Sequence, residues 1–273
     1  MTALKVITIN ILFDLDLWER RRRLLVEGLA TERADIIGVQ EVRLPEDTGA
    51  WLAEQLGMPY VYLVPYQRPD YLKIPNYGAA IFSRHPFTRT EVLDLQSQGR
   101  FAQRVQIEIN DRPIVFCNGH YFWQPGPTPE RVKQIQLLQN WLEELSPEMP
   151  VVAVGDFNGT PDTPAIALMR EKFASAYATH HGSEPEYTCP TPLPRRSWLR
   201  KLRHAVLNLK AHRTLKPWRG TLDYIFINQY FGVRDCRLIL TEPDKGDRTL
   251  YPSDHFGIAA ELELKDAMEM GRR

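Results

Sequence analysis

The chain has 273 residues, of which 43% are hydrophobic and 25% charged, with three cysteines and a formal net charge of zero. This composition is typical of a globular protein with a substantial core, and we expect a single domain over residues 1–273. No apolar run is long enough to span a membrane, and residues 1–16 lack the pattern of a signal peptide. The sequence therefore predicts a cytoplasmic protein with reduced thiols and no transmembrane segment.

Basic residues are concentrated in one segment. Residues 195–219 hold nine Lys and Arg, and residues 188–222 contain no Asp or Glu. We expect a basic insertion at about 190–220, in which Leu199, Leu202 and Leu209 are spaced as a helical stripe. Three interpretations stay open: a solvated surface helix, a contact to a nucleic-acid backbone, or a peripheral membrane contact through this segment.

Short stretches rich in Val, Ile and Phe predict strands of a largely buried sheet system. In chain order they are residues 5–13, 35–42, 78–83, 105–109, 113–122, 151–158, 222–228, 236–240 and 256–264. Helical spacing predicts a helix over 17–33, a second after Thr128 as N-cap with Pro129 in its first turn, and a short third at Thr163 and Pro164. More strands than helices, with helices as covers, favour a layered α/β sandwich.

Polar side chains stand where several predicted strands end. They are Asn10, Glu41, Asn118, His120, Asp156, Asn158, Asp223, Ser253, Asp254 and His255. Charged groups are rarely buried unless they are paired or bound to a metal. Because strand side chains alternate between faces, Asp156 and Asn158 are expected to share one side, and Asn118 and His120 likewise.

Each of these features alone has an ordinary explanation. An Asp-x-Asn sequence before Gly is typical of an Asx turn, Glu41 alone suits a surface strand end, and His255 alone suits a satisfied core histidine. Carboxylates at three separate strand ends together with two imidazoles suit a hard, oxygen-bound cation and acid–base chemistry. The joint pattern therefore indicates a candidate active site.

The ordered motifs resemble the endonuclease/exonuclease/phosphatase superfamily, the deoxyribonuclease I-like group. The resemblance covers nearly the whole chain, through TINILFD, IIGVQEVR, NYGAAIFSRHP, NGHYFW, VGDFNGTPD, TLDYIFIN and YPSDHFGIAAEL. It implies a four-layer α/β/β/α sandwich, in which two mixed β-sheets pack face to face with helices outside. It also implies an active site at one edge of the sheet pair.

The resemblance assigns roles to individual residues. Glu41, Asp254 and Asn10 would hold Mg²⁺ or Mn²⁺, which would polarise a phosphoryl oxygen. Asp156 would orient or deprotonate the attacking water, and Asp223 would fix the tautomer of His255 at the phosphate. The implied catalytic residues are Asp156, His255, Asp223, His120 and Asn158, and the implied phosphate-binding residues are Asn10, Asn118, Asn158 and His120.

The implied reaction is in-line hydrolysis of an anionic phosphoester by an activated water. His120 stands where the apurinic endonucleases have Tyr, which argues against abasic-site repair without choosing among the other branches. We expect first a phosphodiesterase acting on nucleic acid. The alternative is an enzyme on a phospholipid, phosphoinositide or sphingomyelin-type head group, and a distant alternative is a non-catalytic binding module on the same fold.

Two further motifs leave their role open. Tyr121, Phe122 and Trp123 follow His120, and they either stack on a base or pack a loop. The run from Arg20 to Arg23 lies inside the first predicted helix, where successive side chains point in different directions. This favours a solvated helix start with packed side-chain stems over a binding patch.

Overall fold

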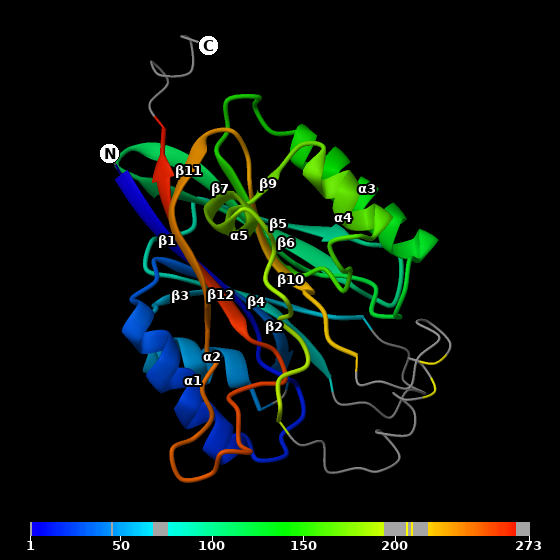
Figure 1. Ribbon diagram of the computed structural model, residues 1–273. Helices are drawn as coiled ribbons and strands as arrows, with labels where there is room; N and C mark the ends of the chain where they lie inside the picture. Colours follow the sequence, from blue (N-terminus) through cyan, green and yellow to red (C-terminus); the bar gives the residue numbers. More distant parts are fainter. Residues whose placement is uncertain are drawn as a thin grey trace.

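The computed structural model describes residues 2–44, 46–67, 76–193 and 218–265, together with residues 206 and 209. Most of the basic segment predicted at 195–219 lies outside these residues, so its three interpretations stay predictions. Two β-sheets form the centre of the molecule, with helices on both outer sides (Figure 1).

Sheet A has the strand order β11, β12, β1, β2, β4, β3. Its strands are β1 (Thr2–Asn10), β2 (Ile36–Arg43), β3 (Tyr60–Pro65), β4 (Tyr77–Ser83), β11 (Phe231–Ile239) and β12 (Gly257–Leu264). Within sheet A, β1 and β2 pair in parallel through a connection that contains α1 (Trp18–Glu32), and the other described pairings are antiparallel. The carboxyl ends of β1 and β2 therefore lie side by side, at Asn10 and Glu41.

Sheet B has the order β5, β6, β7, β8, β10, β9. Its strands are β5 (Arg89–Asp94), β6 (Phe101–Ile109), β7 (Arg112–His120), β8 (Val151–Asp156), β9 (Ala174–Ser175) and β10 (Asp223–Ile227). Its parallel pair is β7 and β8, joined through α3 (Pro129–Glu143). In this sheet, too, the ends of two neighbouring strands meet, at His120 and Asp156.

Three apolar clusters hold the layers together. One lies between the sheets and includes Val105, Phe116 and Ile258. A second packs α1 and α2 (Thr48–Gln55) on the outer face of sheet A, and a third packs α3 and α4 (Pro164–Arg170) on the outer face of sheet B (Figure 1). The short helix α5 (Ala176–His181) lies against β10 and β11. The four-layer sandwich implied by the resemblance is thus confirmed.

The predicted helices are confirmed at 18–32, 129–143 and 164–170, and each predicted strand corresponds to an observed one. Five further elements were not predicted from the sequence: α2, α5 and the strands β3, β5 and β9. These three strands all lie at sheet edges. An edge strand is solvated on one side, and β5 accordingly alternates exposed with half-buried residues, so it lacks the continuous apolar run that marked the central strands.

Candidate active site

Strand register lines up three of the predicted residues across sheet B. In the β7–β8 pair His120 is opposite Asp156, and in the β8–β10 pair Asp156 is opposite Asp223. All three are buried, and His120 Nε2 lies 3.5 Å from Asp156 Oδ2. Residues that are distant in sequence therefore form a row because their strands end together.

His255 completes this row from the loop before β12. Its Nδ1 lies 2.9 Å from Asp223 Oδ2, and its Nε2 lies 3.9 Å from Asp156 Oδ2. Burial lowers the pKa of the imidazole, but the charge of Asp223, the neighbouring Cys189 and the hydrogen bonds to both together outweigh it, so the pKa of His255 lies well above its usual value. The side chain is a charged donor whose Nε2 is directed toward Asp156.

The Asp156 carboxylate is held at both oxygens. Oδ2 accepts from Asn10 Nδ2 at 3.1 Å, and Oδ1 accepts from the backbone N–H of Asn158 at 2.9 Å. Burial raises the pKa of Asp156, and the charge of His255 lowers it in part. A fixed carboxylate with a raised pKa suits a group that exchanges protons with water.

A close backbone approach places Asp156 beside β7. The preceding Gly155 has φ +141°, and a Cβ there would lie 2.0 Å from the carbonyl oxygen of Gly119. Only glycine fits at this position. The Gly in "VGDFN" thus lets β8 approach β7 where the strand delivers Asp156.

Glu41 reaches the site from sheet A through a β-bulge. The β2–β4 register shifts between Gln40 and Val42, and Glu41 has φ +62°. Its Oε2 accepts from the backbone N–H of Phe13 at 3.0 Å. Bulges redirect side chains near active sites, and a left-handed non-glycine residue stores strain of about 1–3 kcal/mol.

Asp254 and Glu41 form a pair of like charges. Burial, and then the charge of Asp254, raise the pKa of Glu41. The loop that carries Asp254 is tied to the end of β1, because Ser253 Oγ donates to the carbonyl oxygen of Asn10 at 2.6 Å. Two carboxylates that repel each other are donors that a hard divalent cation stabilises. The amide oxygen of Asn10, at the end of β1, accepts from the backbone N–H of Leu12 at 3.0 Å.

A second group of possible metal ligands is more compact than the pair of Glu41 and Asp254. One oxygen of Asp156, one of Asp223 and a ring nitrogen of His255 lie within 4.8 Å of one another. However, Asp223 Oδ2 already accepts hydrogen bonds from His255 Nδ1 and, at 2.6 Å, from the hydroxyl of Thr188. We therefore interpret this set as a hydrogen-bonded acid–base group and the set of Glu41, Asp254 and Asn10 as the candidate metal ligands.

Two predicted phosphate ligands have other partners. Asn118 is fully buried, donates to the carbonyl oxygens of Val39 and Ala80, and accepts from Gln40, so it ties sheet B to sheet A. Asn158 lies beyond the end of β8 with φ +51°, so strand alternation does not position it. Its Nδ2 donates to the carbonyl oxygen of Tyr121 at 3.1 Å. We therefore interpret Asn118 as a structural link between the two sheets.

Arg100 is a candidate site residue that the sequence analysis missed. It is 2% exposed, and its guanidinium lies over the rings of Tyr66 and Tyr77 at 4.9 and 5.6 Å. Within the described part of the chain, its Nε and Nη1 have no hydrogen-bond partner. Tyr66 in turn lies edge-on to the ring of His120, with centroids 6.0 Å apart, so Arg100 lies one ring away from a candidate site residue. No motif marks this arginine in the sequence, because its position depends on how the loop before β6 folds.

The interpretation of Arg20 to Arg23 as a solvated helix start is wrong for one residue. Arg21 is fully buried and donates to the carbonyl oxygens of Ile11, Leu12, Asp14, Asp16 and Pro252. Arg20 and Arg23 are exposed and form ion pairs with Asp247 and Asp244, as a solvated helix start requires. Arg21 thus connects the loop after Asn10 to the turn before Asp254.

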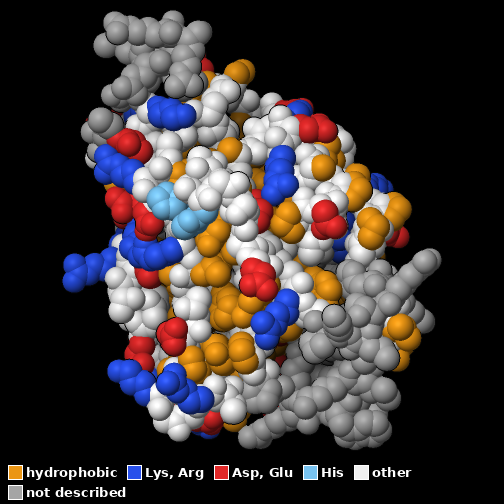
Figure 2. All heavy atoms as spheres, in the orientation of Figure 1, with side chains coloured by type: hydrophobic (Ala, Val, Ile, Leu, Met, Phe, Trp, Pro, Cys, Tyr) orange, Lys and Arg blue, Asp and Glu red, His pale blue; other side chains and the backbone are white. Residues whose placement is uncertain are grey.

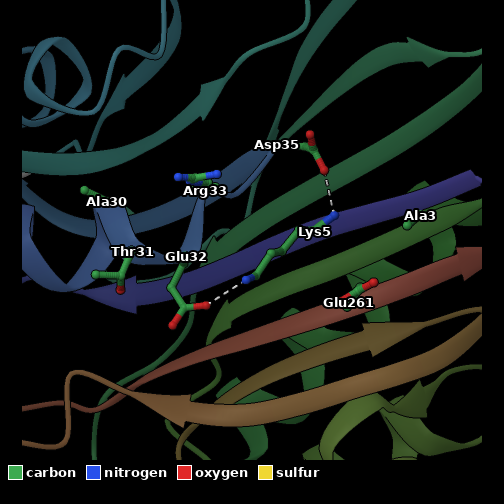
Figure 3. Close-up of a pocket in the computed structure, with 8 residues that line it drawn as sticks. All are labelled: Ala3, Lys5, Ala30, Thr31, Glu32, Arg33, Asp35 and Glu261. Carbon is green, nitrogen blue, oxygen red and sulfur yellow. Dashed lines mark hydrogen bonds and ion pairs between the residues drawn. The ribbon is translucent and has the colours of Figure 1, made fainter.

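A surface hollow lies apart from these candidate site residues. It measures about 850 Å³ and is lined by Ala3, Lys5, Ala30, Thr31, Glu32, Arg33, Asp35 and Glu261 (Figure 3). Lys5 Nζ pairs with Glu32 at 2.9 Å, and Glu32 also pairs with Arg237. The central charges of this hollow are thus matched within the protein. Acidic and basic side chains are likewise interspersed over the face shown in Figure 2.

The match to a family model agrees with this fold and this site. The model of the Endonuclease/Exonuclease/phosphatase family matches residues 7–255, which span every candidate residue described above. The chain therefore belongs to this family.

Human Nocturnin is similar to this chain, with 24% identity over 276 residues that cover 91% of the chain and 59% of Nocturnin. Mus musculus 2′,5′-phosphodiesterase 12 is 24% identical over 194 residues, 66% of the chain and 31% of that protein. The chain thus spans about three-fifths or less of these relatives.

Two solved structures share the fold. The human Nocturnin catalytic domain with bound sulfate anion has a TM-score of 0.73 and 22% identity, covering 96% of this chain and 94% of that one. D. rerio TDP2 complexed with single strand DNA product has a TM-score of 0.74 and 18% identity, covering 96% and 100%. Among the described residues, no helix is long and apolar enough to cross a membrane.

Proposed function

We propose that this protein is a divalent-metal-dependent phosphodiesterase that hydrolyses nucleic acid by in-line attack of water. One observation carries the proposal. His255 lies between two carboxylates, with Nε2 3.9 Å from Asp156 Oδ2 and Nδ1 2.9 Å from Asp223 Oδ2. The carboxylates of Glu41 and Asp254 interact beside this group. Membership of the family supports the reaction class. The nucleic-acid substrate is supported by the relatives named as a 2′,5′-phosphodiesterase and as TDP2 with a single strand DNA product.

In this mechanism Asp156 accepts a proton from the attacking water. Asn10 and the backbone N–H of Asn158 hold its two oxygens, so the carboxylate is fixed before substrate arrives. His255, charged because of Asp223, donates from Nε2 to a phosphoryl oxygen. His120, 3.5 Å from Asp156, is the second imidazole at the phosphate, and Arg100 supplies a further positive charge there.

Glu41, Asp254 and Asn10 would hold a divalent cation, Mg²⁺ or Mn²⁺. Their oxygens match the ligand preference of hard cations, and the mutual repulsion of the two carboxylates is relieved by a positive charge. When bound, the cation would neutralise charge on the phosphoryl and leaving oxygens. Arg21 keeps the two loops that carry Asn10 and Asp254 together.

No contact among the described residues favours the lipid or inositol phosphate alternative. That hypothesis rested on the basic segment 195–219, most of which lies outside the described residues. Nucleic acid therefore remains the proposed substrate, and a cytoplasmic location stays a prediction.

The test is a turnover panel of single- and double-stranded DNA, RNA, inositol phosphates and phospholipid vesicles, with Mg²⁺, Mn²⁺ or EDTA. Asp156→Asn and His255→Ala are each expected to lower nucleic-acid cleavage by about 10²- to 10⁴-fold, because the first removes the proton acceptor and the second removes a charged donor to the phosphoryl oxygen. Circular dichroism checks that both variants are folded.

His85→Ala is the matched control. His85 Nε2 lies 3.6 Å from Asp35, so it also forms an Asp–His pair, but at the end of β2 and β4 opposite to Glu41. This variant should keep full activity. Undiminished cleavage by His255→Ala, or turnover only on lipid or inositol phosphate, would overturn the proposal.

A further inference from the structure

We propose that Arg21 is a positioning residue for the candidate cation site, which binds no cation itself but holds the three candidate ligands in place. This inference rests on the proposed function and goes beyond it, because it makes cation affinity depend on a residue outside the ligand set. Arg21 lies in the first turn of α1, within the run of four arginines from Arg20 to Arg23.

Two contacts of Arg21 lie next to Asn10, at the end of β1. Its Nη1 donates to the carbonyl oxygen of Ile11 at 2.9 Å, and its Nη2 donates to that of Leu12 at 3.3 Å. The backbone N–H of Leu12 in turn donates to Asn10 Oδ1 at 3.0 Å. The amide oxygen of Asn10 is therefore oriented by a residue that Arg21 holds.

The same guanidinium fixes the hydrogen-bond partner of Glu41. Arg21 Nη2 donates to the carbonyl oxygens of Leu12 and Asp14, the residues on either side of Phe13. The backbone N–H of Phe13 is the donor to Glu41 Oε2 at 3.0 Å. The carboxylate of Glu41 is thus bound by a loop that Arg21 holds on both sides of the contact.

A further contact reaches the loop that carries Asp254. Arg21 Nη1 donates to the carbonyl oxygen of Pro252 at 3.1 Å, two residues before Asp254. Between them, Ser253 Oγ donates to the carbonyl oxygen of Asn10 at 2.6 Å. One buried side chain therefore contacts or brackets all three segments that bear on the candidate ligands.

The backbone of the loop after Asn10 needs such support. Leu12 and Leu17 both have φ +61°, and Leu17 caps α1 without a side-chain hydrogen bond. Left-handed residues other than glycine persist only where their surroundings impose this conformation. Arg21 is fully buried, and its Nε also donates to the carbonyl oxygen of Asp16 at 3.3 Å. Without Arg21, we expect this loop to lose its single conformation.

The charge of Arg21 and its contacts predict opposite effects on cation binding. Burial lowers the pKa of Arg21, and the charges of Asp254, Asp14 and Glu41 raise it in part. Its positive charge thus acts on two candidate ligands, and this charge alone would repel a divalent cation. Removal of Arg21 would strengthen cation binding if only charge mattered, whereas loss of positioning weakens it.

Titration of the full chain with Mn²⁺, followed by electron paramagnetic resonance of the free ion, measures the Kd without substrate. Arg21→Met removes every donor but keeps an unbranched apolar side chain. It is expected to raise the Kd by about 10- to 100-fold, the usual loss when a group that orients metal ligands is removed. Arg21→Lys keeps the charge with fewer donors, so its Kd should lie between those of Arg21→Met and wild type.

Arg131→Met is the matched control. Arg131 lies in the first turn of α3 and is 1% exposed. It donates to the carbonyl oxygens of Phe122, Gln124 and Gly126. The variant therefore removes an equally buried arginine from the loop after β7, and it should leave the Kd for Mn²⁺ unchanged. Thermal unfolding without metal measures what each substitution costs in stability.

Cleavage of single-stranded DNA at increasing Mn²⁺ gives a second readout. If Arg21 acts through the cation site, excess Mn²⁺ should restore much of the kcat of Arg21→Met, with KM for the DNA little changed. A variant that is merely less stable would show the wild-type dependence on Mn²⁺ with a smaller active fraction.

An unchanged or lower Kd in the folded Arg21 variants, or an equal rise in Arg131→Met, would overturn the inference. If Arg21→Met does not fold, the Kd of Arg21→Lys decides. If the wild-type protein binds no Mn²⁺, or hydrolyses only lipid or inositol phosphates, the proposed function has failed. If it binds Mn²⁺ and cleaves nucleic acid while the Arg21 variants match it, only the positioning role has failed.

Discussion

Among single residues, Thr188 has a contact that bears on catalysis without touching substrate. Its hydroxyl donates to Asp223 Oδ2 at 2.6 Å and accepts from the backbone N–H groups of Leu222 and Asp223. The same Asp223 oxygen accepts a hydrogen bond from His255 Nδ1. Thr188 therefore orients the carboxylate that orients His255, and it is a positioning residue in the proposed mechanism.

Thr188→Val should lower kcat by about 10- to 100-fold with KM little changed, because a hydrogen bond to a charged group is worth about 1.5–3 kcal/mol. Thr188→Ser keeps the hydroxyl and should restore most of the rate. Thr191→Val is the control, since Thr191 donates to the Ser253 carbonyl oxygen and not to Asp223. Steady-state kinetics and the NMR signal of the His255 Nδ1 proton measure the effect. Equal losses in all three variants would contradict the assignment.

Within the strands, the approach of β8 to β7 at Gly155 controls where Asp156 lies. Gly155→Ala should destabilise the protein by about 1–3 kcal/mol, because the Cβ meets backbone rather than a flexible side chain. It should also reduce turnover, because relief of the clash moves Asp156.

Urea unfolding and turnover of Gly155→Ala test this expectation. Gly57→Ala is the control, since Gly57 also has a positive φ, +61°, but nothing within 4 Å of the added Cβ. It should cost about 1 kcal/mol or less and leave turnover unchanged. A Gly155→Ala protein as stable and active as this control would show that the close approach is not required.

How far the sequence predicts each element depends on its place in the sheet. Central strands such as β8 are buried on both faces and were recognisable as apolar runs. The edge strand β5, RTEVLD, has no such run, because most of its residues are exposed. The edge strand β3, YVYLVP, is apolar along its length but was not predicted. The polar residues at predicted strand ends and turns identified Asn10, Asp156 and Asp254 as candidates. The bulge at Glu41 could not be predicted in this way, because it depends on the pairing between β2 and β4.

Buried polar residues show the same limit. Arg21 and Arg100 are ordinary arginines in the sequence. Only the folded structure shows that Arg21 binds five carbonyl groups, whereas Arg100 lies over the rings of Tyr66 and Tyr77. Asn118 was recognised as a polar strand residue, but its role between the sheets follows from contacts to β2 and β4. Which elements a side chain contacts is a property of the assembled sandwich.

Across the whole molecule, the repulsion between Glu41 and Asp254 links metal binding to stability. A divalent cation at 100 times its Kd should stabilise the fold by about 2.7 kcal/mol and raise Tm by about 5–10 °C. Differential scanning calorimetry with Mg²⁺, Mn²⁺ or EDTA measures this shift. In the double variant Glu41→Gln, Asp254→Asn the shift should be lost. A shift as large as in wild type would place the cation elsewhere.

The position of β12 has a consequence for synthesis of the protein. This strand is late in the chain, yet it lies inside sheet A between β11 and β1, and the loop before it carries Asp254 and His255. Ser253 and Asn10, joined by a hydrogen bond, are 243 residues apart. A chain still on the ribosome that stops short of this loop lacks both groups. Without β12, the edges of β1 and β11 that pair with it also remain unpaired. Completion of sheet A and the proposed cleavage of nucleic acid would therefore begin together, once translation of the mRNA has passed β12.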